Sequence, residues 1–102
     1  MSDIKQALKA VVKRILEGDG QASVAQRRAA FDNAVADQPL GALVQKVALR
    51  PSTVTDEDVT AVKESGLSED QIFELVVCSA IGQAKRQYDA ALEALASATR
   101  SE

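Results

Sequence analysis

The chain has 102 residues, of which 46% are hydrophobic, 3% aromatic and 26% charged, with a net charge of −3, one cysteine and no histidine. These values predict one ordered domain over residues 1–102, and they exclude a disordered chain and a strongly basic nucleic-acid-binding protein. No apolar run approaches the roughly 20 residues of a membrane span, the start lacks a secretory signal, and one cysteine permits no intrachain disulfide. We therefore expect a cytoplasmic protein that binds neither nucleic acid nor membrane.

The first predicted helix covers residues 3–17 and is ended by the glycines of residues 18–20. Apolar residues recur along it at helical spacing and form one stripe: Ile4, Leu8, Val11, Val12, Ile15 and Leu16. Its other face is mostly basic, so the pattern is that of an amphipathic helix with one side turned towards a core.

The second predicted helix starts after Ser23, which forms a capping box with Gln26. We expect it to continue to residues 37–39, with four side chains facing inward: Val24, Phe31, Ala34 and Val35. The third helix begins near Pro39, a favourable first-turn residue, and Pro51 closes it because the residue before a proline avoids the helical region.

The fourth helix has the clearest start, with Thr55 as N-cap and Asp58 as the third helical residue of a capping box. Gly66 is expected to end it. Ser68 and Gln71 repeat the capping device immediately afterwards and begin the last helix. A helix–turn–helix over residues 55–71 is therefore the firmest local prediction.

The last predicted helix covers residues 69–99 and spans roughly 45 Å at about 1.5 Å per residue. Because a compact domain of this length has a radius of gyration of only about 13 Å, the helix is expected to project or to pack along a partner. One apolar stripe follows its whole length: Phe73, Val77, Ala80, Ala84, Tyr88, Ala91 and Leu95. A second stripe makes its first half apolar nearly all round: Ile72, Leu75, Val76 and Ser79. The predicted fold is therefore an all-α domain of about five helices with a long C-terminal helix.

The distribution of charge is uneven along the chain. Residues 56–74 hold seven acidic side chains and one lysine, whereas residues 1–50 hold eight basic and five acidic side chains. Solvated helix starts explain the acidic segment, because acids are favoured near helix N-termini. The alternative is electrostatic head-to-tail pairing between subunits.

Few residues are suited to chemistry. The absence of histidine removes the commonest general base and metal ligand, and no glycine-rich phosphate loop is present, so we expect no metal and no cofactor. Glu74 and Cys78 lie four residues apart and share one helix face, and Glu74 is the one charge in residues 72–81. With Arg86 and Tyr88 they form the set of candidate site residues, as an acid–base group with a possible anion pocket.

Structural explanations compete with each of these candidates. The preferred interpretation of Cys78 is a small buried hydrophobe, and that of Glu74 is the ion-pair partner of Arg86 or of a basic residue in the first helix. The adjacent basic pairs at residues 27–28 and 85–86 are expected to be solvated surface. Gly82, in mid-helix among small residues, marks a close contact between helices.

The segment of residues 54–95 carries the sequences TDEDVTAVKESGLSEDQIFELVV and SAIGQAKRQYDAALEAL. It resembles the alkylhydroperoxidase D-like and carboxymuconolactone decarboxylase superfamily, in which a Gly-Leu-Ser turn precedes a long apolar helix. Redox members of that family carry Cys-x-x-Cys-x-x-x-His before the turn, whereas this chain has Pro51, Val54 and Asp58 at those positions. The resemblance implies an all-helical fold and trimers or hexamers built through the long helices, without the peroxide-reducing mechanism.

Two functional hypotheses follow. The leading one is a non-catalytic homo-oligomer that acts as a scaffold or a small-ligand binder. The alternative is an enzyme with a rewired, non-redox acid–base site of Glu74, Cys78, Arg86 and Tyr88, acting on a small organic acid. Convergence of these four side chains on one pocket would favour the enzyme, and their burial in a helix interface would favour the scaffold.

Overall fold

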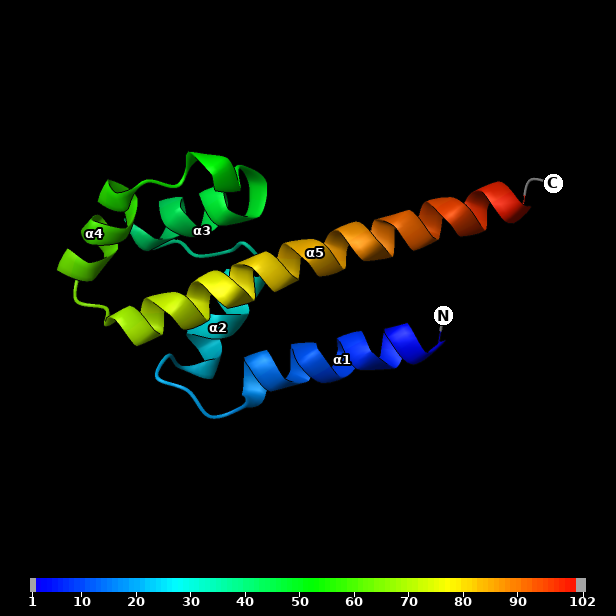
Figure 1. Ribbon diagram of the computed structural model, residues 1–102, viewed down its shortest axis with the longest axis horizontal. Coiled ribbons are helices and arrows are strands. Elements are labelled where there is room, and N and C mark those ends of the chain that lie inside the picture. Colours follow the sequence, from blue (N-terminus) through cyan, green and yellow to red (C-terminus); the bar gives the residue numbers. More distant parts are fainter. Residues whose placement is uncertain (1, 101–102) are drawn as a thin grey trace.

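The computed structural model describes residues 2–100, which form five α-helices and one short 3₁₀ helix with no strand (Figure 1). In chain order they are α1 (Ser2–Glu17), α2 (Val24–Phe31), α3 (Leu40–Leu49), η1 (Pro51–Thr53), α4 (Asp56–Glu64) and α5 (Glu69–Arg100). The predicted all-α class and the long C-terminal helix are confirmed. Within residues 2–100, no helix is long and apolar enough to cross a membrane.

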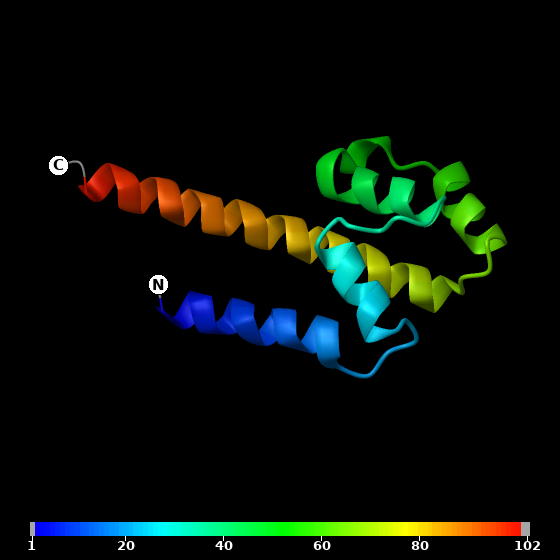
Figure 2. The same cartoon turned by 180° about the vertical axis from the view of Figure 1, so that it is seen from behind.

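The long helix α5 organises the fold, because each of the other α-helices packs against it. Helices α3 and α4 lie on one side of its first half, α2 crosses it, and α1 runs antiparallel to it (Figures 1 and 2). The C-terminal end of α5 extends beyond the other helices (Figure 1), and the molecule measures 54 × 29 × 20 Å. The expected projection of the last helix is therefore observed.

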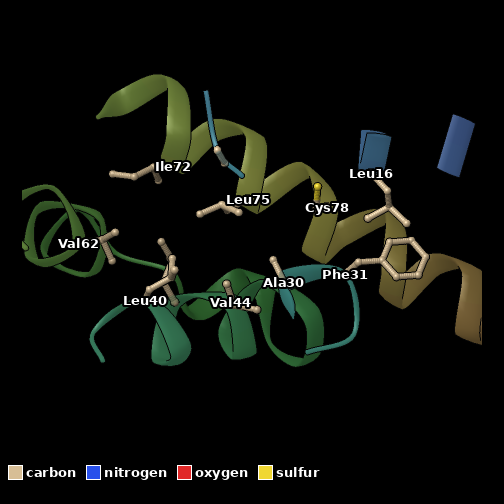
Figure 3. Close-up of a cluster of buried hydrophobic side chains, with 11 residues drawn as sticks. Leu16, Ala30, Phe31, Leu40, Val44, Val62, Ile72, Leu75 and Cys78 are labelled. Atoms are coloured by element: carbon tan, nitrogen blue, oxygen red, sulfur yellow. The ribbon is translucent and has the colours of Figure 1, made fainter. Parts of the chain in front are cut away.

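The hydrophobic core lies where α2, α3 and α4 meet the first half of α5 (Figure 3). The second predicted stripe of α5 faces this core: Leu75 is fully buried, and the buried Ser79 hydroxyl donates to the Val44 carbonyl oxygen at 3.0 Å. The other buried members come from every α-helix and from the loop before α2: Leu16, Ala22, Ala30, Phe31, Leu40, Leu43, Val44, Val62, Ile72 and Cys78. With one phenylalanine in the cluster, aliphatic side chains make up nearly all of the core.

The first predicted stripe of α5 is largely uncovered. Phe73 and Leu95 are 69% and 61% exposed, and the alanines at positions 80, 84 and 91 are exposed as well. On α1, Ile4 and Val11 are 56% and 44% exposed. A single copy of the chain thus leaves one long apolar face in contact with solvent.

The predicted caps are confirmed by their hydrogen bonds. Both bonds of the capping box are present at the starts of α2 and α4. At the start of α5, the Gln71 backbone N–H donates to the Ser68 hydroxyl oxygen at 3.1 Å, and the Ser68 backbone N–H donates to Gln71 Oε1 at 2.8 Å. Gly66 follows α4 with a φ of 115°, which side chains other than glycine rarely adopt. These short-range devices set the helix starts.

Helix α2 is shorter than predicted, and the expectation that it continues to residues 37–39 is wrong. It ends at Phe31, and Asn33 adopts a left-handed φ of 53°. The Asn33 N–H donates to the Ala30 carbonyl and the Ala34 N–H to the Ala29 carbonyl, which is the bond pattern of a Schellman motif with asparagine in the usual place of glycine. The prediction that the Val24 side chain faces inward is also wrong, since Val24 is 47% exposed.

The end of α2 abuts α5 at Gly82. A Cβ atom at this position would overlap the Phe31 carbonyl oxygen and would lie 2.7 Å from the Phe31 carbonyl carbon. The predicted close helix contact at Gly82 is therefore confirmed, and it explains why a residue with poor helix propensity stands in the middle of α5.

Candidate functional site

A cleft of about 420 Å³ opens between the end of α1 and the first half of α5. Its volume lies in the usual range for sites that hold small molecules. The lining combines arginines, carboxylates, one thiol and apolar side chains: Arg14, Ile15, Gly18, Asp19, Arg27, Phe73, Glu74, Val77 and Cys78. Two of the four candidate site residues, Glu74 and Cys78, therefore share this cleft.

Arg27 is the buried charge of the cleft, with 6% of its surface exposed. Its Nη1 donates to the carbonyl oxygens of Ile15 at 3.2 Å and Gly18 at 2.6 Å, at the negative end of the α1 dipole. Its Nε is enclosed and has no hydrogen-bond partner. The expectation that residues 27–28 are both solvated surface is wrong for Arg27 and correct for Arg28, which is exposed.

Sequence reasoning had a usable signal for this burial. Arg27 precedes Ala30 and Phe31 by three and four residues, so it lies on the core-facing side of α2. The neighbouring Arg28 falls on the opposite side. A pair of adjacent arginines on a helix therefore cannot be treated as one surface feature, because a single residue step rotates the side chain by about 100°.

Glu74 fixes the loop between α1 and α2. Its two carboxylate oxygens accept from the Gln21 backbone N–H at 2.9 and 2.8 Å. A Cβ atom on Gly20 would overlap Glu74 Oε1, so a side chain at this position would require the carboxylate to move. The predicted ion pair between Glu74 and Arg86 or a basic residue of α1 is wrong, because a backbone amide is the observed partner.

Cys78 lies below the cleft, 1% exposed, with its Sγ 3.6 Å from the Ile15 carbonyl oxygen. Burial raises the pKa of the Cys78 thiol, Arg27 acts in the lowering direction, and Glu74 adds to the rise. The thiol is therefore protonated near neutral pH, and only the thiolate is a good nucleophile. The interpretation of Cys78 as a small buried hydrophobe is confirmed.

Arg86 and Tyr88 lie elsewhere on α5. Arg86 donates from Nη1 to the Phe31 carbonyl oxygen at 2.6 Å and from Nη2 to Gln83 Oε1 at 3.0 Å, so it caps the end of α2. Tyr88 lines a separate hollow of about 70 Å³ against α1, where its hydroxyl is buried without a partner. The four candidate residues therefore do not converge on one pocket.

The described chain offers no evident metal centre: within residues 2–100, no group of three or more histidine, cysteine, aspartate or glutamate side chains is arranged to hold a metal ion. The cleft instead supplies guanidinium groups, a carboxylate held by a backbone amide, and a protonated thiol. Such a lining suits noncovalent recognition of a polar group more than covalent or metal-assisted chemistry.

Comparisons of the chain with protein-family models, with curated proteins and with solved structures found no match.

Proposed function

We propose that this chain is a non-catalytic helical scaffold of the cytoplasm that assembles with copies of itself through α5. The single observation that carries the proposal is the α5 stripe, by which we mean Phe73, Val77, Ala80, Ala84, Tyr88, Ala91 and Leu95. Five of its seven members are exposed, and the other two, Val77 and Tyr88, are half-buried beside α1. Long uncovered apolar faces usually mark interfaces.

The shape of the molecule supports the same proposal. From Phe73 to Leu95 the stripe is roughly 33 Å long at 1.5 Å per residue. Its C-terminal end lies on the part of α5 that projects beyond the other helices (Figure 1). The exposed alanines at positions 80, 84 and 91 allow a second helix to approach closely, and the exposed Phe73 and Leu95 stand at the two ends of the stripe. A helix of this length without a partner would be stabilised on one side only.

The stripe also has an internal symmetry that suits a second copy of the same helix. Its intervals are four, three and four residues on each side of Ala84, so the pattern reads the same in both directions. In an antiparallel pair of α5 helices crossing at Ala84, the facing residues are Phe73 with Leu95, Val77 with Ala91, and Ala80 with Tyr88. The larger members of two of these pairs, Val77 and Tyr88, already pack beside α1, so the contact uses mainly the exposed Phe73, Leu95 and alanines.

The intervals of four, three and four residues add to a repeat of eleven residues, which is close to three full turns of an α-helix. The two stripes therefore stay in register along nearly straight helices. Such a contact is two-fold and self-complementary. By itself it builds a dimer, and a hexamer of three such dimers would need a second contact. The hexamer is one of the two assemblies implied by the resemblance to the alkylhydroperoxidase D-like superfamily. A closed trimer would need a different contact.

Sedimentation equilibrium at micromolar concentrations tests this proposal. We expect the parent protein to be an oligomer and Ala84→Glu to shift it towards the monomer, because two carboxylates would meet at the centre of the contact. The matched control is Ala90→Glu, at an exposed alanine of the same helix outside the stripe. A parent protein that stays monomeric would contradict the scaffold proposal. An oligomer equally tolerant of both substitutions would contradict the antiparallel contact at Ala84.

The dispersal of Glu74, Cys78, Arg86 and Tyr88 gives the enzyme hypothesis no common pocket in which these residues can act together. The scaffold is therefore the function that the geometry supports best.

A further inference from the structure

We infer that the cleft beside Arg27 binds a small ligand that carries one carboxylate on a short apolar body. This binding site is additional to the scaffold role, and its lining shares Phe73 and Val77 with the α5 stripe.

Arg27 is a buried cation without an anionic partner. The ion pairs within residues 2–100 all use lysines: Lys46 with Asp58, Lys63 with Glu69 and Lys85 with Asp89. Buried charges are costly unless they are paired and fully hydrogen-bonded. The two backbone carbonyls on Nη1 give Arg27 partial compensation, yet Nε lacks an acceptor and Nη2 forms no hydrogen bond within the described residues. A carboxylate matches a guanidinium group in geometry as well as in charge.

The other charges around the cleft are compatible with an anion at this place. Arg14 adds a second guanidinium group to the lining. Glu74 is one of the two carboxylates of the lining, and both of its oxygens already accept from the Gln21 N–H. Asp19 is exposed, so solvent screens its charge. The positive charge that remains buried and without a full counter-charge is that of Arg27.

The remaining lining determines the rest of the ligand. Ile15, Phe73 and Val77 contribute apolar surface next to the guanidinium groups, and the Cys78 thiol lies below them. A cleft of about 420 Å³ accommodates a small molecule but not a folded partner. A compact apolar body attached to a carboxylate satisfies both parts of the lining.

Nuclear magnetic resonance titration of the full chain with isovalerate tests the inference, with isovaleramide as the uncharged isostere. We expect saturable shifts of the Arg27 Nε–Hε resonance and of backbone amides around the cleft. The affinity for isovaleramide should be at least about tenfold lower than that for isovalerate, because hydrogen bonds to a charged group are stronger than those to a neutral one. Equal shifts from acid and amide, or an unmoved Arg27 resonance, would overturn the inference.

Substitutions locate the effect. Arg27→Gln should weaken isovalerate binding at least about tenfold, whereas Arg28→Gln, on the exposed side of the same helix, should leave it unchanged. Equal loss in both variants would overturn the assignment. If Arg27→Gln does not fold, Arg14→Gln replaces it, at an exposed position of the cleft lining. We expect Arg14→Gln to lower the affinity for isovalerate by a smaller factor. An unchanged affinity would contradict the proposed site. The oligomeric state is measured separately by sedimentation, so failure of ligand binding and failure of the scaffold proposal are distinguishable.

Discussion

Replacing Gly82 with alanine sets two effects of opposite sign against each other. In a helix interior, alanine is favoured over glycine by about 1 kcal/mol. Here, however, the new Cβ would overlap the Phe31 carbonyl oxygen and stand 2.7 Å from its carbon. These are backbone atoms, so α2 as a whole would have to move away from α5. Overpacking of this kind costs about 1–3 kcal/mol, occasionally more.

A displacement of α2 would also weaken the bond from Arg86 Nη1 to the Phe31 carbonyl oxygen, which is 2.6 Å long in the parent protein. We therefore expect the steric cost to exceed the gain in helix propensity, with a net destabilisation of about 1–3 kcal/mol. For a domain of this size, each kcal/mol lowers the thermal midpoint by about 4–8 °C.

Urea unfolding followed by circular dichroism measures this difference, at one protein concentration because the proposed self-association would make stability depend on concentration. The matched control is Ala90→Gly, at an exposed position of the same helix, which calibrates the propensity difference without a steric contact. If Gly82→Ala stabilised the protein by about 1 kcal/mol, helix propensity alone would decide the outcome, and the close approach of α2 to α5 would be refuted.

Three further predictions concern the caps, the thiol and pH. Ser68→Ala removes an acceptor of the Gln71 N–H and should destabilise the protein by about 0.5–2 kcal/mol in urea unfolding; an unchanged midpoint would contradict the cap. Cys78, which is 1% exposed and has a raised pKa, should react slowly with a thiol reagent in the native protein and rapidly in denaturant; rapid native labelling would contradict its burial. The hydrogen bond from Lys46, with that from the Thr55 N–H, lowers the pKa of Asp58 below its ordinary 3.8. The stabilisation from Asp58 is therefore present above pH 3.8 and is lost as pH falls through the lowered pKa of the folded protein. The unfolding midpoint of Asp58→Asn should accordingly fall less at acid pH than that of the parent protein.

Much of the local structure follows from the sequence alone, because its causes act over a few residues. The Thr55–Asp58 and Ser68–Gln71 boxes each satisfy backbone N–H groups within one helical turn, and both are observed as predicted. The helical spacing of apolar residues likewise predicts the all-α class and the length of α5. Gly82 could be recognised because a glycine in mid-helix needs a reason from packing.

Other features were decided by contacts between segments far apart in the chain. The carboxylate of Glu74 meets the Gln21 N–H, 53 residues away, and no local pattern identifies that partner. Arg27 became a buried cation because the carbonyls at the end of α1 stand against it. Helix α2 ends early, at Phe31, because Asn33 adopts a left-handed backbone conformation. Asparagine adopts that conformation only in some contexts. Periodicity shows that a residue belongs to an apolar face, but only the arrangement of neighbouring helices decides which apolar face becomes core. For that reason Leu75 is fully buried while Phe73, two residues earlier on the same helix, remains available to a partner.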